Sequence, residues 1–409
     1  MSRASIEAGQ RWLVAGGFAE PCTYGQLVQE VIRDNAELSG HTTPGGVGEL
    51  LIAMLRAAWR GQTIKVGEPE FEGEGVSRLG PQAMDPARGL LGDKDAFFAQ
   101  LMGTDKGRVV LSSSGSEGAP SAVTHKMRTL GRAVVTGDRH RNDVWGLAFN
   151  PAHIAAVQVL LQAIANGNTI VNLWGIPSGE VIQRCRYWGV THLSATPTFY
   201  RMIAAQSLAL PAIRSISVGG EASDEQLMHH LRRMFPAARL HNVYASTEAG
   251  TVLASDGVDF QLRDIDSTRL RINQGRLWIH RDMFADSTCA TEWFDTGDLV
   301  EITGVDPTRF RIVGRRGNIL NVGGEKVNPL EVEAALAEHP AVAVSRVFGR
   351  RNSVTGAILA ADIVSKGDRP EEADLRDHLV QRLPAYKIPR IIRFVDRLEL
   401  TGTGKVKRI

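Results

Sequence analysis

The stretch from Leu111 to His125, LSSSGSEGAPSAVTH, follows a short apolar run and contains five serines and two glycines. Backbone amides and hydroxyl groups in such a loop can donate hydrogen bonds to phosphate oxygens, and glycines let the backbone approach a ligand closely. The glycine spacing differs from that of a Walker A loop, and no Gly-Lys-Ser/Thr follows. Taken alone, the stretch fits a phosphate-binding loop or a solvated serine-rich connection equally well.

Five further motifs follow along the chain: VGGE at 218–221, YASTE at 244–248, FDTGDL at 294–299, VGRRGNILNVGGEKVNPLEVE from Val313, and GTGKVKR at 402–408. Each motif alone could be a turn or a core strand. With SSGSEGAP at 113–120, and in this order, they resemble the adenylate-forming superfamily of acyl- and aryl-CoA synthetases. The resemblance runs from about Thr23 to the C terminus, and the chain is similar in size to the compact o-succinylbenzoate:CoA ligases.

The resemblance implies a two-step ligation. A carboxylate attacks the α-phosphate of ATP, giving an acyl adenylate and pyrophosphate, and a thiol then attacks the acyl carbon. The nucleophile and the attacked phosphate are both anionic, so the site must supply cations and oriented donors as charge develops. The implied cofactors are ATP, Mg²⁺ and coenzyme A, or a phosphopantetheine in place of coenzyme A.

The resemblance assigns catalytic roles to three residues. Lys405 matches the lysine that reaches from a mobile C-terminal domain to the carboxylate and the α-phosphate. Glu248 matches the magnesium-binding glutamate, and a carboxylate suits this hard cation. His153 matches a position that lines the acyl pocket. From the residues alone, Lys405 could be one of several basic residues in a tail, and His153 could be a capping or core histidine.

The resemblance also implies a nucleotide site. The serine-rich loop closes over the β- and γ-phosphates with the Ser116 hydroxyl as a donor, and the Gly-Gly-Glu turn lies against adenine. Thr247 contacts the α-phosphate, and Asp298 accepts both ribose hydroxyls with Arg315 close by. The residues expected to bind nucleotide are Ser113, Ser114, Gly115, Ser116, Glu117, Gly118, Gly219, Gly220, Glu221, Asn242, Tyr244, Ala245, Ser246, Thr247, Asp298 and Arg315. Without the resemblance, the Gly-Gly-Glu turn could be a plain strand-to-helix turn and Asp298 a strand-end cap.

The chain departs from the family pattern in two respects. Ser121 stands where relatives usually have a lysine, so the loop carries less positive charge. Gly317 replaces the Asp or Lys usually found at the hinge between the domains, which affects how freely or how accurately the domains rotate.

The elements that must position these residues follow from the hydrophobic pattern. Apolar runs that precede polar or glycine-rich turns alternate with helical segments, which predicts a parallel α/β sheet with ligands at the carboxyl ends of its strands. From about Gln274, short alternating segments predict antiparallel strands or a small barrel. A helix–strand–helix tail then predicts a compact α+β domain. We expect an N-terminal domain at 1–316 and a mobile C-terminal domain at 317–409.

Composition narrows the class of protein. The 409 residues exceed the usual size of one domain, and 47 Lys and Arg nearly balance 45 Asp and Glu, which disfavours a nucleic acid or an acidic membrane as the main partner. Three distant cysteines argue against a disulfide framework or a zinc site. No apolar run is long enough to span a bilayer. We expect a cytoplasmic enzyme, monomeric or homodimeric, that acts on a small carboxylic acid.

The predicted function is therefore an ATP-dependent acid:thiol ligase, with coenzyme A as the favoured acceptor. A carrier-protein phosphopantetheine is the first alternative and an amine the second. A nucleotide-binding regulatory paralogue without catalysis is the alternative from another class, and the presence of Glu248, Asp298 and Lys405 argues against it. The sequence does not identify the acid.

Overall fold

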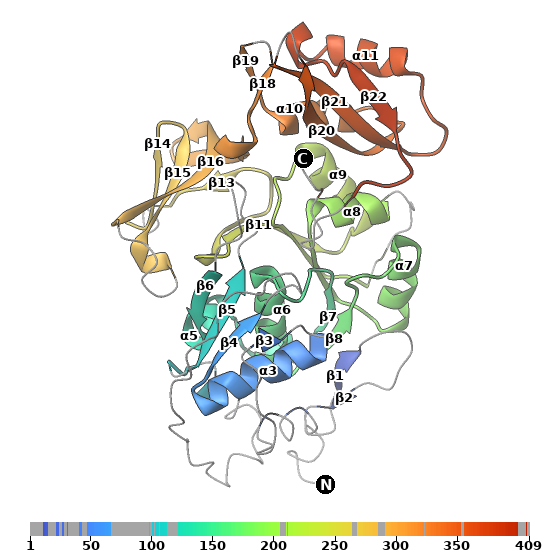
Figure 1. The fold of residues 1–409 in the computed structure, drawn as a ribbon. Coiled ribbons are helices and arrows are strands. Elements are labelled where there is room, and N and C mark those ends of the chain that lie inside the picture. The colour runs from blue at the N-terminus through green and yellow to red at the C-terminus, as the bar shows by residue number, and fades with distance from the viewer. Residues whose placement is uncertain are drawn as a thin grey trace.

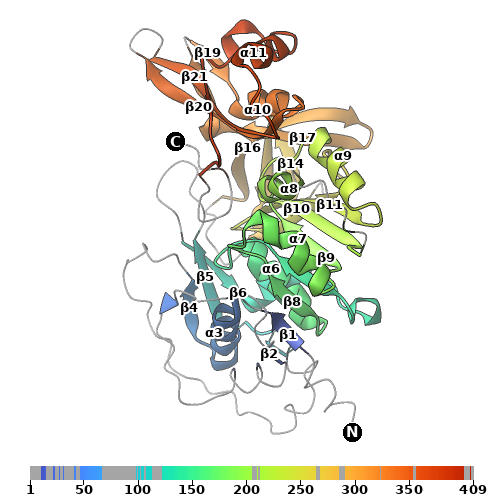
Figure 2. The same cartoon turned by 90° about the vertical axis from the view of Figure 1, so that its right-hand side faces the viewer.

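A computed structural model describes residues 11–14, 22–23, 27, 31, 41–42, 47–66, 98, 100–101, 103–105, 107–112, 122–204, 210, 212–263, 268–284, 291–322, 324–352, 356–399 and 406. The expected serine-rich loop at 113–118, Ser121 and the catalytic candidate Lys405 lie outside these residues. The expected α/β class is confirmed, with large N-terminal sheets and a smaller α+β C-terminal part (Figures 1 and 2).

The central sheet has eight strands in the order β12-β11-β10-β9-β7-β8-β1-β2, and all neighbours from β11 to β1 are parallel. The edge strands β12 and β2 are antiparallel to their neighbours. The strands are β1 (Arg11–Val14), β2 (Cys22–Thr23), β7 (Val144–Leu147), β8 (Thr169–Asn172), β9 (His192–Ala195), β10 (Ser215–Gly219), β11 (Arg239–Ser246) and β12 (Gly250–Ser255). The helices between them are α6 (Ile154–Ala165), α7 (Ser178–Tyr187), α8 (Pro197–Ala204) and α9 (Glu225–Met234).

Helix α6 shows how local sequence forms these elements. Eight of its twelve residues are buried, and its apolar run ends at Asn-Gly-Asn. Gly167 has a φ of 67°, a left-handed conformation that glycine adopts without a Cβ penalty. The Asn168 amide then donates to the Ala163 carbonyl at 2.8 Å, which ends the helix and starts β8. This helix-to-strand transition fits the expected alternation of helical segments and apolar strands.

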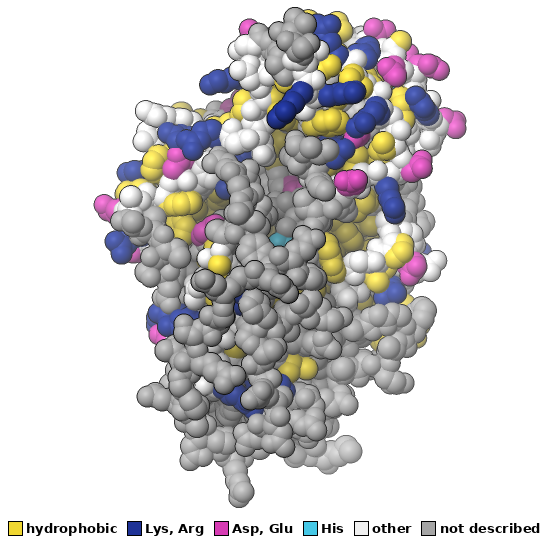
Figure 3. Space-filling view, viewed as in Figure 1, with side chains coloured by type: hydrophobic (Ala, Val, Ile, Leu, Met, Phe, Trp, Pro, Cys, Tyr) yellow, Lys and Arg dark blue, Asp and Glu magenta, His cyan; other side chains and the backbone are white. Residues whose placement is uncertain are grey.

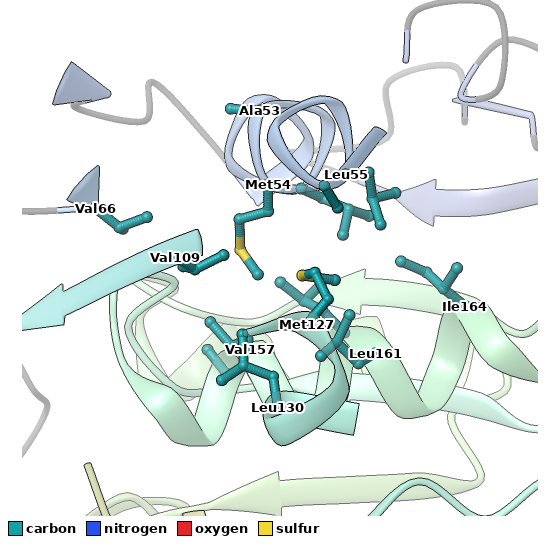
Figure 4. Close-up of a cluster of buried hydrophobic side chains, with 14 of the residues drawn as sticks. Ala53, Met54, Leu55, Val66, Val109, Met127, Leu130, Val157, Leu161 and Ile164 are labelled. Carbon is teal, nitrogen blue, oxygen red and sulfur yellow. The ribbon is translucent and has the colours of Figure 1, made fainter. Parts of the chain in front are cut away.

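A four-stranded sheet, β3-β4-β5-β6, lies beside the central sheet (Figure 1). It contains β3 (His41–Thr42), β4 (Thr63–Val66), β5 (Arg108–Ser112) and β6 (Ala122–Lys126), with helix α3 (Val47–Arg60) before β4 and α5 (Met127–Leu130), η2 (Gly131–Ala133) and η3 (Asp138–His140) after β6. Figure 4 shows Met54 and Leu55 of α3 pointing toward Met127 of α5 and Leu161 of α6. One hydrophobic cluster therefore joins this sheet to the central sheet.

Strands β5 and β6 form an antiparallel pair, with Ser112 opposite Ala122. The serine-rich stretch thus connects the two strands of a hairpin. The apolar run before the loop is β5, whereas β6 after the loop has no apolar run that would mark it as a strand.

The strands after β12 form a five-stranded antiparallel sheet in the order β13-β17-β16-β15-β14. Antiparallel strands were one of the two forms expected from about Gln274, and the sheet begins earlier, since β13 and β14 precede that residue. Its elements are β13 (Phe260–Gln261), β14 (Leu270–Asn273), β15 (Arg276–His280), η5 (Arg281–Met283), β16 (Trp293–Val305) and β17 (Thr308–Arg315). Its core includes Tyr244 and Leu253 of the central sheet, so the two sheets share a hydrophobic cluster.

The C-terminal part has its own hydrophobic cluster, whose buried residues come from the range 327–392. Its elements are η6 (Arg316–Asn318), β18 (Leu320–Val322), β19 (Glu325–Val327), α10 (Pro329–Ala337), β20 (Val342–Asn352), β21 (Gly356–Ser365), α11 (Glu372–Val380), η7 (Ala385–Lys387) and β22 (Ile391–Phe394). These elements lie above α8 and α9 in Figure 1, and Figure 3 shows their Lys and Arg side chains interspersed with Asp and Glu. The domain boundary at 316/317 stays a prediction.

A buried ion pair crosses the C-terminal sheet. Arg346 of β20 pairs with Asp362 of β21, and these side chains are 8% and 3% exposed. The more exposed Arg393 of β22 donates to the same carboxylate at 2.7 Å. Both guanidinium groups lie 5.0 to 5.5 Å from the centre of the Phe348 ring. A single aspartate therefore links all three strands.

No helix within the described residues is long and apolar enough to cross a membrane.

Candidate active site

The Gly-Gly-Glu turn and the YASTE segment lie side by side at the carboxyl edge of the central sheet. Gly219 at the end of β10 is in register with Val243 of β11. A Cβ on Gly219 would lie 3.0 Å from the Val243 carbonyl oxygen, and Gly220 has a φ of 85°. Glycine therefore avoids a tight contact at Gly219 and backbone strain at Gly220. Ligands of open α/β sheets bind at this edge.

The Glu221 side chain has a structural partner. Its Oε2 accepts hydrogen bonds from the Thr198 amide at 3.0 Å and the Thr198 hydroxyl at 2.7 Å. Thr198 lies in the first turn of α8, where amides lack helical partners and a carboxylate is favourable. The carboxylate thus caps α8.

Asn242 is another predicted nucleotide ligand with partners in the protein. It is 4% exposed, and its Nδ2 donates to the Gly257 carbonyl at 3.0 Å. Its Oδ1 accepts from the Ser223 hydroxyl at 3.3 Å. The side chain therefore joins the segment after β10 to the segment after β12.

Three predicted residues form one network across two sheets. The Tyr244 hydroxyl donates to Asp298 Oδ2 at 2.6 Å, and Arg315 Nε lies 3.5 Å from Asp298 Oδ1. Asp298 and Arg315 are register partners in β16 and β17. The Asp298 amide also donates to the Thr296 hydroxyl at 3.1 Å. The carboxylate is thus oriented by a phenol and a guanidinium, and the Thr296 hydroxyl holds the backbone that carries it.

Tyr244 acts as a donor in this network. Burial raises the pKa of its phenol well above the ordinary value, and the neighbouring Asp298 charge raises it further. The phenol stays protonated at neutral pH and can always donate to the carboxylate.

We expect Tyr244→Phe to raise KM for ATP about threefold to tenfold with little change in kcat. The substitution removes one hydrogen bond to the carboxylate that the resemblance assigns to the ribose, and the net contribution of one such bond is about 1 kcal/mol when Arg315 still holds the acceptor. Steady-state pyrophosphate release at varied ATP measures this effect. A fall in kcat at unchanged KM would show that Asp298 does not act in nucleotide binding.

Glu248 lies in the turn between β11 and β12. The Ala249 amide donates to the Ser246 hydroxyl at 3.1 Å, and Gly250 has a φ of 69°. Glu248 is half-buried, and within the described part of the chain no group hydrogen-bonds or ion-pairs with its carboxylate. The carboxylate oxygens have the hard character that Mg²⁺ prefers. Ala245, Ser246 and Thr247 precede Glu248 on the same half-buried segment.

His153 occupies the N-cap position of α6, directly after the loop that follows β7. Strand order reverses around β7, since β8 lies on one side of it and β9 on the other. Ligands of doubly wound sheets bind at such a reversal. The side chain is half-buried and makes no capping hydrogen bond. Its position suits both a pocket residue and a simple helix start.

Two residues that hold the Glu248 turn were missed in the sequence analysis. His125 Nε2 of β6 lies 2.7 Å from the Thr247 carbonyl oxygen. Arg132 Nη2 of η2 donates at 2.9 Å to the carbonyls of both Ala249 and Met283. A histidine in the strand that leaves the serine-rich loop was the available sign, since alternate residues of β6 are buried.

The remaining predicted positions are partly described. Val406, the residue after Lys405, is 9% exposed. Gly317 is exposed in η6, and its φ is not among the positive ones. The hinge candidate therefore has an ordinary backbone conformation here.

Comparisons with known proteins agree with this arrangement. The AMP-binding enzyme family matches residues 97–280, and the AMP-binding enzyme C-terminal domain matches residues 331–405. The chain is 29% identical over 390 residues to an isonitrile lipopeptide synthase of Streptomyces coeruleorubidus, covering 84% of the chain and 25% of that protein. It is 25% identical over 343 residues to the mitochondrial acyl-coenzyme A synthetase ACSM5 of Homo sapiens, covering 72% of the chain and 59% of that protein. The chain thus spans less than two thirds of either relative.

Solved structures show the same fold. E. coli MenE with bound OSB-AMS superposes with a TM-score of 0.71 at 17% identity, covering 96% of this chain and 92% of that one. The amide bond synthetase McbA from Marinactinospora thermotolerans superposes with a TM-score of 0.66 at 18% identity, covering 99% and 96%.

Proposed function

The chain belongs to the adenylate-forming superfamily of AMP-binding enzymes, and we propose that it activates a carboxylic acid with ATP and passes the acyl group to a thiol. In the first step a carboxylate oxygen bonds to the α-phosphorus, and the bond to pyrophosphate breaks. In the second step the thiol sulfur bonds to the acyl carbon, AMP leaves, and the thiol proton is released. Coenzyme A is the favoured thiol.

The observation that carries this proposal is the end of strand β11. The Tyr244 hydroxyl there donates a hydrogen bond to Asp298 at 2.6 Å. Glu248 follows four residues later, and no described residue hydrogen-bonds or ion-pairs with its carboxylate. This short segment therefore supplies a carboxylate for a cation and contacts the carboxylate proposed for the ribose. This spacing supports a nucleoside phosphate laid across the strand end, with its base toward Gly219.

In this proposal each described residue acts by orientation or charge. Asp298 accepts the ribose hydroxyls, and Arg315 holds it from the neighbouring strand. Gly219 and Gly220 leave room for the flat base. The Thr247 hydroxyl donates to the α-phosphate, where negative charge increases during attack. Asn242 and Glu221 hold the surrounding turns.

Glu248 is the residue proposed to hold Mg²⁺. When bound, the cation would neutralise phosphate charge during attack by the carboxylate. Glu248 contributes the oxygen ligand, and the turn contacts from His125 and Arg132 keep that ligand in place.

The acceptor separates the proposed function from its alternatives. ACSM5 is named an acyl-coenzyme A synthetase, which supports coenzyme A. McbA is named an amide bond synthetase, which supports an amine as a specific second candidate. A carrier-protein phosphopantetheine offers the same thiol as coenzyme A, and the isonitrile lipopeptide synthase supports considering it.

A panel of aryl and short- to medium-chain acids, read by pyrophosphate release from Mg·ATP, tests the first step. Release that depends on the added acid supports the ligase. Addition of coenzyme A or a simple amine to the reactive acid then identifies the acceptor by product mass. Silence across the panel, with ATP demonstrably bound, would favour a regulatory nucleotide-binding protein.

The proposed boundary at Gly317 yields a further prediction. Proline fixes φ near −65°, within the usual range of a 3₁₀ turn such as η6, and opposes rotation about this residue. We expect Gly317→Pro to slow the complete reaction about tenfold and pyrophosphate release much less, because only the second step follows domain rotation. Separate measurement of pyrophosphate and product formation gives both rates. Gly317→Ala is the matched control, and an unchanged overall rate at unchanged stability would place the hinge elsewhere.

A further inference from the structure

His125 is a buried histidine that connects two segments far apart in the chain. It is 1% exposed in β6, paired across the sheet with Val109 of β5. Its Nε2 lies 2.7 Å from the carbonyl oxygen of Thr247. A carbonyl oxygen only accepts hydrogen bonds, so Nε2 carries the proton and donates it.

The Thr247 carbonyl is one of two carbonyls held on either side of Glu248. Arg132 holds the other by donating to Ala249 at 2.9 Å. Both donors come from one short segment, β6 to η2, and they contact the residues directly before and after Glu248. The backbone of this residue is therefore fixed from both sides by side chains outside its own hairpin.

A fixed backbone has a direct chemical consequence at this position. The Glu248 carboxylate has no described partner that would orient it, so its placement depends on the turn that carries it. Ligands for Mg²⁺ must meet near-ideal octahedral geometry, and misplacement by about 1 Å costs up to about a hundredfold in related catalytic arrangements.

We infer that His125 is a positioning residue that holds the Glu248 turn in register for metal-assisted nucleotide binding. The inference rests on the proposed function, since it assumes that Glu248 is the metal ligand. His125 does not touch substrate or metal in this role and acts through the Thr247 carbonyl.

The test measures how much Mg²⁺ strengthens ATP binding, by calorimetry on the full-length protein with ATP in excess Mg²⁺ and in EDTA. Loss of one hydrogen bond to a buried carbonyl should reduce the Mg²⁺-dependent gain in ATP affinity about tenfold in His125→Phe. His125→Gln keeps an N–H donor at a similar reach and should restore most of the gain. A merely structural histidine would not show this rescue at equal thermal stability.

A double-mutant cycle sharpens the test, because His125 should matter only through Glu248. In a Glu248→Gln background, His125→Phe should cause no further loss of the Mg²⁺-dependent gain. The matched control is His192→Phe. His192 is also a mostly buried, hydrogen-bonded histidine on a strand, but it lies at the amino end of β9, away from the carboxyl edge of the sheet. Its loss should leave the Mg²⁺-dependent gain unchanged.

The outcomes separate this inference from the proposed function. An equal Mg²⁺-dependent gain in the wild type and His125→Phe, or additive losses in the cycle, overturns the role of His125 while leaving the ligase proposal intact. The protein could show the expected loss, rescue and non-additive cycle of the Mg²⁺-dependent gain and yet release no pyrophosphate with any acid. That result would support the positioning role of His125 and overturn the ligase chemistry. A wild type that binds ATP without any gain from Mg²⁺ overturns the inference.

Discussion

Replacing Lys405 by alanine is expected to slow acyl adenylate formation about 10²–10³-fold, the usual cost of removing one preorganised donor from a developing anion. Thioester formation from supplied acyl adenylate should largely survive, because the second step develops no new charge between the carboxylate and the α-phosphate. The two half-reactions are measured separately, by pyrophosphate release and by product formation from synthetic acyl adenylate. The prediction rests on the GTGKVKR motif.

The control for Lys405 is Lys366→Ala, which removes an exposed lysine of the same C-terminal part. Both half-reactions should keep their rates in this control. Equal loss in both half-reactions of Lys405→Ala would assign the adenylation role to another residue.

The largest expected effect on stability comes from Asp362→Ala. This substitution leaves Arg346, which is 8% exposed, without its carboxylate and deprives Arg393 of the same partner. Removing one member of a buried ion pair costs about 3–5 kcal/mol, since the remaining charge stays desolvated. The loss should appear in denaturant unfolding of the full chain, in the transition that includes the sheet β20–β22.

The matched control is Asp377→Ala, which removes an exposed carboxylate from α11 of the same part. Surface substitutions of this kind change the free energy of unfolding by about 0.5 kcal/mol or less. Arg393→Ala should lie between the two, because its side chain is 53% exposed. If Asp362→Ala costs no more than Asp377→Ala, the buried pair does not stabilise the sheet.

The elements with strong hydrophobic patterns could be predicted from the sequence. β10 and β11 alternate buried and less buried residues before their polar turns, and α6 ends at a recognisable Asn-Gly-Asn. β6 was missed because one of its two buried positions is His125, which does not mark an apolar face.

The candidate site also contains features that the sequence predicts and features that it does not. The Asp298–Arg315 pair lies on adjacent strands of one hairpin, and the family resemblance of the motifs that carry these residues implied their proximity. The contact of His125 with Thr247 joins residues 122 positions apart, and no local pattern encodes such a distance. The side-chain partners of Glu221 and Asn242 depend on how helices and turns pack against the sheet, which spacing alone does not determine.

The capping of α8 by Glu221 bears on how a purine would be chosen. Both hydrogen bonds from Thr198 fall on Oε2, so the helix fixes the direction of the carboxylate while Oε1 can still accept a hydrogen bond. The amino group of an adenine placed at this turn could donate to that oxygen. Base preference would then depend on a side chain whose direction is set by α8, together with the main-chain amides and carbonyls beside Gly219 and Gly220.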